Sequence, residues 1–171
     1  KAKTFGIELH KLKRNELYKF KQITSSTSER RNYDDKTLDY YEKFYDSFGN
    51  NAEFIIASIN FKNYLERLQS NQDELSKNIK QLQAYLEKNN HSPEKKLNQI
   101  RELSSQFETF EIRKSEAYQL LEKYGNKSII LAGSLFVYTP QETVYLFSGS
   151  YPEFNKFYAP ALLQDYVMRE S

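Results

Sequence analysis

Apolar and polar positions in the N-terminal third of the chain follow first a strand-like and then a helix-like pattern. They alternate in GIELHKL, as in a half-buried strand, and then recur at helical spacing in RNELYKFKQITSSTSERR through Leu17, Phe20 and Ile23. A second helix is predicted in KTLDYYEKFYDSFGN, whose aromatic face ends at Gly49, a residue that tolerates a left-handed backbone. The short β-branched run EFIIASINF then predicts a buried strand.

From Phe61 onward, apolar positions lie three and four residues apart, which is the pattern of a coiled-coil seam. The first seam comprises Leu65, Leu68, Gln72, Leu75, Ile79, Leu82 and Leu86, and the second comprises Ile100, Leu103, Phe107, Phe110, Lys114, Ala117, Leu121 and Tyr124. A turn signal at Ser92–Pro93 separates them, so the sequence predicts an antiparallel helical hairpin with arms about 45 Å long. We interpret this hairpin as an insertion that reaches a partner or acts as a spacer.

The C-terminal part predicts a β-hairpin and a helix. Two strands are expected in SIILAGSLFVYT and ETVYLFSGS, joined at TPQE, and a helix is expected in NKFYAPALLQDYVMRES. Alternation places Val144 and Leu146 in the core, together with Phe154. The stretch SGS is expected to form a turn, where a glycine either allows a ligand to approach the backbone or only serves packing. The predicted fold is α+β, with residues 1–59 and 125–171 forming one domain around a helical arm at residues 60–124.

Composition narrows the chemistry that the chain can perform. With 171 residues, 39% apolar and 28% charged, and a mean hydropathy of −0.80, part of the chain must be extended and solvated. The absence of cysteine excludes disulfides and thiolate metal sites, and it suits a reducing compartment. Only His10 and His91 provide imidazoles; we expect both at the surface and expect no metal site or Ser-His-Asp triad. No run approaches the roughly 20 apolar residues of a bilayer span.

Charge is distributed unevenly along the chain. Residues 1–31 contain 9 cationic and 3 anionic side chains, whereas residues 60–124 contain 11 and 10. A basic segment attracts phosphate groups of nucleic acid or of a nucleotide-like or lipid-linked substrate, although it also suits a solvated helix face. The near-neutral arm predicts weak electrostatic binding to RNA, confined to a local cluster such as Lys95 and Lys96. The chain has no glycine-rich Q/R-x-x-G-x-G/A loop, so a coenzyme-A acyltransferase is disfavoured.

The order of these elements, with TSERRNYDDKTLDYYEKFYDSFG before the arm and SGS followed by FYAP and Q after it, resembles the second domain of the FemABX aminoacyltransferases. These Gram-positive enzymes, which include methicillin-resistance factors, add Gly, Ser or Ala from aminoacyl-tRNA to the stem-peptide lysine of a peptidoglycan precursor. The resemblance covers nearly the whole chain. It implies a partial GNAT-like (acyltransferase-like) domain with an inserted antiparallel coiled-coil hairpin. It also implies a first domain before Lys1 and further strands after Ser171, so the isolated chain is expected to be inactive.

The partners implied by this resemblance are an aminoacyl-tRNA donor and a lipid-linked or UDP-linked precursor as acceptor. A homo- or hetero-oligomer with related transferases is also consistent with it. No cofactor is expected, and the location implied is the cytoplasm, including the inner face of the membrane. No catalytic nucleophile is expected either, because the donor ester is already activated and the acceptor amine needs only positioning and loss of a proton. The catalytic residues therefore stay unassigned.

The resemblance also implies three substrate-binding positions. An arginine that contacts the precursor phosphate in the family matches Lys36, and a tyrosine one helical turn later matches Tyr40. A binding tyrosine of the family matches Phe147, which has no hydroxyl to donate. The adjoining Ser148 and Gly149 complete the predicted site.

Each of these residues also has a structural interpretation. Lys36 could be a surface charge beside Asp34 and Asp35, and Tyr40 could pack with its aromatic neighbours. Two other function classes remain open from the residues alone. One is a tRNA- or RNA-binding module, suggested by the basic N-terminal segment and the arm, and the other is a structural coiled-coil adaptor.

Overall fold

The computed structural model describes residues 2–88 and 94–170. It divides into two compact units, an α/β unit of Lys1–Ile59 with Ser128–Ser171, and a helical arm of Asn60–Lys127. The turn predicted at Ser92–Pro93 and the side chain of His91 lie outside the described residues.

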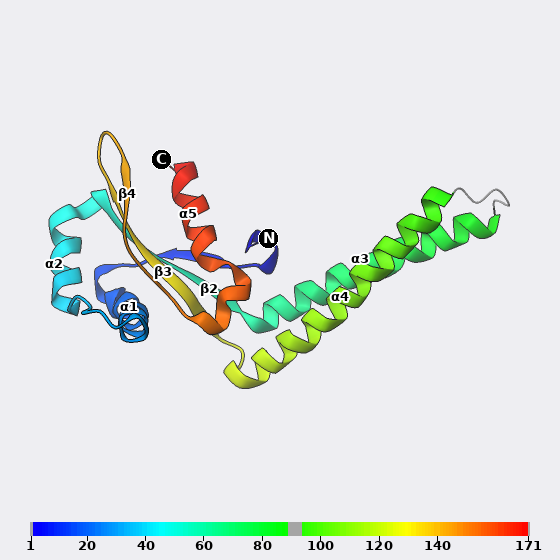
Figure 1. Ribbon diagram of the computed structural model, residues 1–171, viewed down its shortest axis with the longest axis horizontal. Helices are drawn as coiled ribbons and strands as arrows, with labels where there is room; N and C mark the ends of the chain where they lie inside the picture. The colour runs from blue at the N-terminus through cyan, green and yellow to red at the C-terminus, as the bar shows by residue number, and fades with distance from the viewer. Residues whose placement is uncertain (1, 89–93, 171) are drawn as a thin grey trace. The chain divides into compact units, whose positions relative to one another are not determined.

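The α/β unit is built on a four-stranded sheet in the order β1-β2-β3-β4, with β1 antiparallel to β2 and β3 antiparallel to β4 (Figure 1). Its strands are β1 Glu8–Lys11, β2 Ala52–Asn60, β3 Ser128–Tyr138 and β4 Thr143–Ser150. Its α-helices are α1 Leu17–Arg31, α2 Leu38–Phe48 and α5 Ala159–Glu170. Short 3-10 helices occupy Ala2–Phe5, Arg14–Glu16, Gly49–Asn51 and Pro152–Phe157. The predicted strands and the predicted link between β3 and β4 at TPQE are confirmed.

Helices α1 and α2 cover one face of the sheet and α5 covers the other (Figure 1). Because β3 is covered on both faces, it has no solvent side, and its sequence is an almost continuous apolar run. The last helix begins later than predicted. The residues Pro152–Phe157 form a 3-10 helix that ends at Tyr158, whose backbone is left-handed with φ of 56°. The α-helix therefore starts only at Ala159.

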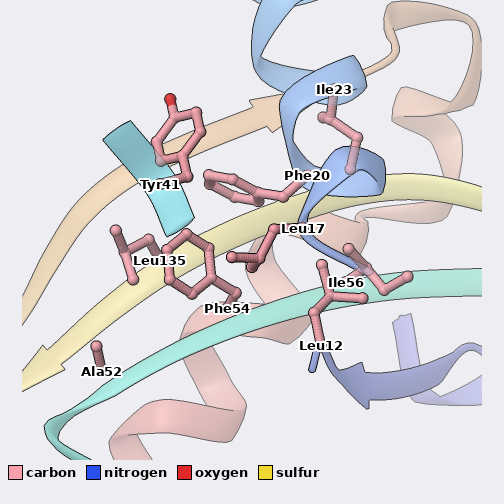
Figure 2. Packing of buried hydrophobic residues seen from close by; sticks show 9 residues of the cluster. All are labelled: Leu12, Leu17, Phe20, Ile23, Tyr41, Ala52, Phe54, Ile56 and Leu135. Carbon is pink, nitrogen blue, oxygen red and sulfur yellow. The ribbon is translucent and has the colours of Figure 1, made fainter. Parts of the chain in front are cut away.

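The core between α1, α2 and the sheet is mainly aromatic and aliphatic (Figure 2). It consists of Leu12, Leu17, Phe20, Ile23, Tyr41, Ala52, Phe54, Ile56 and Leu135. The ring of Phe20 meets those of Tyr41 and Phe54 edge to face, each with centroids 5.1 Å apart. Full burial of such side chains contributes about 1.5–3 kcal/mol each, so this cluster holds both helices against the sheet.

The SGS stretch is not a turn, which corrects the expectation from the sequence. Ser148, Gly149 and Ser150 are the last residues of β4 and pair with β3. A Cβ atom at Gly149 would lie 2.7 Å from Ile23 Cγ2 and 2.9 Å from the Ile23 carbonyl oxygen. The glycine is therefore required because α1 passes directly over the strand.

The core assignment of Leu146 is also wrong, since this side chain is 40% exposed. The register between β3 and β4 shifts here, because Leu135 pairs with Phe147 while Phe136 pairs with Tyr145. Leu146 is the extra residue of a β-bulge, and such a residue reverses the alternation of faces along a strand. Phe147 consequently faces α1 and α2. Val144 is only half-buried, and Phe154 is buried as predicted.

The arm consists of two helices, α3 Phe61–Lys88 and α4 Glu94–Tyr124. They run antiparallel, since the rings of Phe61 and Tyr124 lie 5.7 Å apart at one end and Gln72 meets Glu111 farther along. The predicted seam positions are buried or half-buried throughout, whereas most positions between them are exposed. Supercoiling of the two helices, like the GNAT-like character of the α/β unit, stays a prediction.

Candidate functional site

The segment between α1 and α2 is fixed at both ends by local backbone geometry. Asn32 adopts a left-handed conformation with φ of 56°, which asparagine tolerates better than most residues. Its N–H donates to the Glu29 carbonyl, and the Tyr33 N–H donates to the Ser28 carbonyl at 3.1 Å. These two bonds form a Schellman motif that ends α1. At the other end, Thr37 Oγ1 caps α2 by accepting a hydrogen bond from the Tyr40 N–H.

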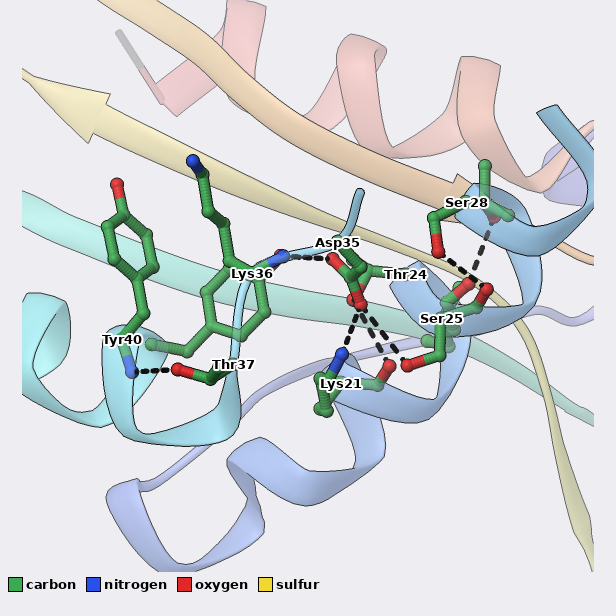
Figure 3. Close-up of polar contacts among 11 residues, drawn as sticks. Lys21, Thr24, Ser25, Ser28, Asp35, Lys36, Thr37 and Tyr40 are labelled. Carbon is green, nitrogen blue, oxygen red and sulfur yellow. Dashed lines mark hydrogen bonds and ion pairs between the residues drawn. The ribbon is translucent and has the colours of Figure 1, made fainter. Parts of the chain in front are cut away.

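Asp35 ties the middle of this segment to α1 (Figure 3). Its Oδ2 accepts hydrogen bonds from Lys21 Nζ at 2.5 Å, from Thr24 Oγ1 at 3.0 Å and from Ser25 Oγ at 3.1 Å. Its Oδ1 accepts from the Lys36 backbone N–H at 2.8 Å and from the Tyr41 hydroxyl at 3.0 Å. A carboxylate is well suited to this position because every group around it is a donor.

The protonation states of this cluster follow from its surroundings. Burial alone would raise the pKa of the Asp35 carboxyl, but hydrogen bonds from Lys21, Thr24 and Tyr41 outweigh it and hold the pKa below its usual range. Burial raises the pKa of the Tyr41 phenol, and the adjacent carboxylate raises it further. Asp35 is therefore an anion and Tyr41 a hydrogen-bond donor at neutral pH.

Lys36 and Tyr40 extend side by side, away from the Asp35 carboxylate (Figure 3). The Lys36 ammonium lies 5.5 Å from the centroid of the Tyr40 ring. Asp35 binds the backbone of Lys36, not its ammonium. Within residues 2–88 and 94–170, the Lys36 ammonium has no carboxylate partner and the Tyr40 hydroxyl has no hydrogen-bond partner. A cation and a hydroxyl donor are thus presented together to solvent.

Phe147 joins these two residues from β4. Its ring meets that of Tyr40 at 6.3 Å and that of Tyr41 at 6.0 Å, both nearly perpendicular. Tyr41 is buried beneath them, with 1% of its surface exposed, and Tyr40 keeps 37%. The rings form an aromatic platform, defined here as Tyr40, Tyr41 and Phe147, that carries Lys36 at its edge. Packing of Tyr40 with its neighbours and exposure of its hydroxyl therefore occur together.

The other two predicted site residues lie apart from this platform. Gly149 shares the face of Phe147 but is covered by Ile23 and Thr27 of α1, which leaves no room for a ligand. Ser148 is exposed and lies between these two positions on the strand, so its side chain is directed to the opposite face. The structure brings together Lys36, Tyr40 and Phe147 only.

The basic N-terminal segment is partly neutralised by ion pairs. Four cations among its described side chains pair with carboxylates, namely Lys11 with Glu53, Arg14 with Asp46, Lys19 with Glu16, and Lys21 with Asp35. In the arm, the Lys96 ammonium lies 3.3 Å from the centroid of the Tyr85 ring. The ion pairs of the N-terminal segment leave less free charge for nucleic-acid phosphates than the sequence suggests, whereas Lys96 keeps its charge.

A concavity of about 380 Å³ lies near the junction of α2 and β2, apart from the aromatic platform. Glu53 provides its only carboxylate among the described lining residues, and both of its oxygens are occupied, one by Lys11 and the other by the Tyr138 hydroxyl at 2.7 Å. It therefore offers no free charge to a ligand. No group of three His, Asp or Glu side chains suited to a metal ion occurs in the part of the chain that the structure describes.

Comparison with known proteins assigns the family. The FemAB family model matches residues 1–171, the whole chain. The chain belongs to the FemAB family. The aminoacyltransferase FemA of Staphylococcus epidermidis RP62A is 28% identical over 159 residues, and that of Staphylococcus aureus N315 is 29% identical over the same length. Each match covers 92% of this chain and 37% of the relative, so the chain spans little more than a third of these curated relatives.

A similar fold is seen in a solved structure. The crystal structure of FemX matches 99% of this chain and 42% of that chain, with a TM-score of 0.84 and 22% sequence identity. This likeness establishes a shared fold. None of the helices within residues 2–88 and 94–170 has both the length and the apolar character needed to cross a bilayer.

The sequence pattern does not identify Asp35 and Tyr41 as parts of this candidate site. The sequence alone suggests Asp35 as a charge partner of Lys36, and Tyr41 as part of an apolar helical face. The available signal was an aspartate two residues before the Thr37 cap, but such a residue is usual near a helix start. The five donors to Asp35 come from α1, the connecting segment and α2, and only the fold brings these elements together.

Proposed function

We propose that the chain is the acceptor-binding part of an aminoacyltransferase of peptidoglycan bridge synthesis. The full-length protein transfers Gly, Ser or Ala from aminoacyl-tRNA to the stem-peptide lysine or to the growing bridge of a lipid-linked or UDP-linked precursor. The family match over the whole chain and the names of the FemA relatives support this proposal. The observation that carries it is the unpartnered pair of Lys36 ammonium and Tyr40 hydroxyl on the aromatic platform.

The pair has the chemistry expected for an anion with several oxygen atoms. The ammonium supplies charge and up to three donors, and the phenol supplies one directed donor. Lys36 immediately precedes the cap of α2, where the free N–H groups of a helix start also favour an anion. Because nucleotide-linked and lipid-linked precursors both contain a diphosphate, that group is the proposed ligand of Lys36 and Tyr40.

The proposed reaction is an aminolysis of an ester. The acceptor amine attacks the carbonyl carbon of the aminoacyl ester and loses a proton, so an amide bond forms as the ester C–O bond breaks. The proton is taken up by the 3′-terminal ribose oxygen of the tRNA, which leaves as a hydroxyl. Since the donor is already activated, no cofactor is required. The role assigned to Lys36 and Tyr40 is to hold the acceptor, and we place the protein in the cytoplasm, where both substrates occur.

The test is calorimetric binding of UDP-linked precursor to the full-length protein that contains this chain. Lys36→Ala and Tyr40→Phe should each weaken binding by roughly 1–3 kcal/mol, the range for hydrogen bonds to charged groups. Lys43→Ala and Tyr18→Phe are matched controls, because Lys43 is a solvent-exposed lysine on α2 and Tyr18 an exposed tyrosine on α1. Equal affinities for all variants, with the fold intact, would overturn the proposal.

A gain-of-function variant provides an independent check. Phe147→Tyr would add a hydroxyl to the ring that meets Tyr40, so the precursor should bind more tightly. Phe48→Tyr adds the same hydroxyl to an exposed ring on α2 that stacks on Phe44 instead, and should have no effect. Repeating both measurements with lipid-linked precursor in detergent would distinguish a nucleotide-linked from a lipid-linked acceptor.

A further inference from the structure

We propose that Asp35 is the positioning residue of the acceptor site, because it fixes the backbone of Lys36 and the ring on which Tyr40 rests. This inference rests on the function proposed above. It assigns to Asp35 no contact with the substrate. Its role is to hold the two contact residues at the separation and direction that a diphosphate requires.

The first connection is to the backbone of Lys36. Oδ1 of Asp35 accepts the Lys36 N–H at 2.8 Å, which fixes the peptide plane from which the Lys36 side chain extends (Figure 3). The segment between Asn32 and Thr37 has no regular structure and no partner strand, so its path depends on such side-chain bonds. Losing this bond frees the peptide from which the ammonium projects.

The second connection runs through Tyr41. Its hydroxyl donates to Oδ1 of Asp35 at 3.0 Å, while its ring contacts Phe20, Tyr40 and Phe147 with centroids 5.1, 5.7 and 6.0 Å apart. Tyr41 is thus held at one end by Asp35 and at the other by the core. Since the Tyr40 ring packs on it, the direction of the Tyr40 hydroxyl depends on this buried tyrosine.

The third connection anchors Asp35 itself to α1. Lys21, Thr24 and Ser25 all donate to Oδ2, and only 10% of the Asp35 side chain is exposed. An asparagine would place an NH₂ group on one side of this cluster, facing only donors. The isosteric change therefore loses hydrogen bonds as well as the ion pair with Lys21, and should release the segment without creating a cavity.

The experiment measures the Kd of UDP-linked precursor for full-length protein carrying Asp35→Asn. We expect binding to weaken about tenfold, which is equivalent to losing roughly one hydrogen bond to the ligand. Asp34→Asn is the matched control, since Asp34 is the exposed neighbour without a hydrogen bond or ion pair among the described residues. Tyr41→Phe removes one bond to Asp35 but keeps the ring, and should give a smaller loss of affinity with the fold retained.

A coupling measurement separates positioning from a general loss of stability. In a Lys36→Ala/Tyr40→Phe background, Asp35→Asn should weaken binding by less than about twofold, because the residues through which it acts are gone. If the loss of affinity is the same in both backgrounds, or if Asp35→Asn and Tyr41→Phe bind like the unchanged protein, the inference is wrong.

The outcome also separates this inference from the proposed function. If Lys36→Ala and Tyr40→Phe weaken binding while Asp35→Asn does not, only the role of Asp35 fails. If none of the substitutions at Lys36, Tyr40 and Asp35 changes the Kd, the acceptor site itself is wrong.

Hydrogen exchange tests the first connection, between Asp35 and the Lys36 backbone, without any ligand. The Lys36 amide should exchange with solvent faster in Asp35→Asn than in Asp34→Asn, and equal rates would contradict the hydrogen bond to Asp35.

Discussion

A leucine in the core of the α/β unit and a leucine in the seam of the arm have different surroundings. Leu17 of α1 is completely enclosed by the neighbouring helix and the sheet. Leu82 of α3 keeps part of its surface in water, as most seam positions of the arm do, because a pair of helices encloses a residue from fewer sides. The α/β unit gains its stability from a three-dimensional core, whereas the arm gains it in small increments along its length.

Buried polar groups also differ between the two units in the number of elements that surround them. In the α/β unit, Asp35 is surrounded by donors from several elements and fixes an irregular segment. In the arm, Gln72 is 2% exposed and forms a polar layer with Glu111 and Lys114 of the facing helix. A core that encloses a residue from all sides can hold a side chain in place for a ligand. A two-helix seam can at most fix the alignment of the helices.

The largest expected difference in stability between the two units comes from truncating one matched leucine in each. Leu17→Ala should lower the free energy of unfolding by about 2–5 kcal/mol, the range for enclosed leucines. Leu82→Ala should cost about 1 kcal/mol, because its cavity opens to solvent and less transfer free energy is lost. Urea unfolding of the 171-residue chain, monitored in each unit by hydrogen exchange, measures both. Equal costs would mean that the arm is enclosed as fully as the core.

The close approach of α1 to β4 provides the second test. Gly149→Ala should cost about 1–3 kcal/mol, because the new methyl group meets the Ile23 carbonyl, and backbone cannot move aside easily. Ser148→Ala, one residue earlier and exposed, is the control and should change stability little. Thermal melts of both variants measure the change in Tm that each substitution causes. An unchanged Tm for Gly149→Ala would reopen this position for ligand contact.

The polar layer of the arm is tested by a double-mutant cycle. Lys114 donates to Gln72 Oε1 at 2.8 Å, and a coupling free energy of about 0.5–1.5 kcal/mol is expected from Gln72→Ala, Lys114→Ala and the double variant. The exposed pair of Gln69 and Asp73, also 2.8 Å apart, lies on the same helix and should couple more weakly. If the buried pair does not couple more strongly, the layer does not align the helices.

The smallest expected effect on stability is the loss of the Glu16 contribution at acidic pH. Hydrogen bonds from Lys19, the Lys13 backbone and His10 lower the pKa of Glu16 from 4.5 to about 2. Because the folded pKa lies below the unfolded one, Glu16 stabilises the fold above pH 4.5, and this contribution disappears as pH falls to about 2. Glu16→Gln should therefore be less stable than the unchanged protein at pH 6 and equally stable at pH 2. A constant difference across that range would contradict the assignment.

Periodicity predicted the strands, the helices and the seams because each depends on many residues repeating one pattern. The arm is the clearest case, since positions from Leu65 to Leu86 all repeat the same spacing. Gly49 was predicted to end α2 and does so with a positive φ. In contrast, the bulge at Leu146 involves a single extra residue, which does not interrupt the apolar pattern of the strand, so the exposed side was assigned wrongly.

The candidate site was predictable only where a resemblance identified single residues. Lys36, Tyr40 and Phe147 lie together in the structure, although they come from the segment before α2, from α2 and from β4. A glycine between two serines, as at Gly149, predicts a turn that a ligand could approach. The helix that fills this space, α1, lies more than a hundred residues earlier in the sequence. Contacts over such separations leave no local pattern.

The position of the arm between β2 and β3 affects how the chain folds. These strands are neighbours in the sheet but are separated by residues 61–127, and closing a loop of that length is entropically unfavourable. The arm reduces this penalty, because its first and last turns meet through Phe61 and Tyr124, and Asn60 donates to Asn126 at 3.0 Å. Helical hairpins have low contact order and form quickly. If the arm folds first, the ends of the two strands are already close, and the effective loop that closes the sheet is only a few residues long.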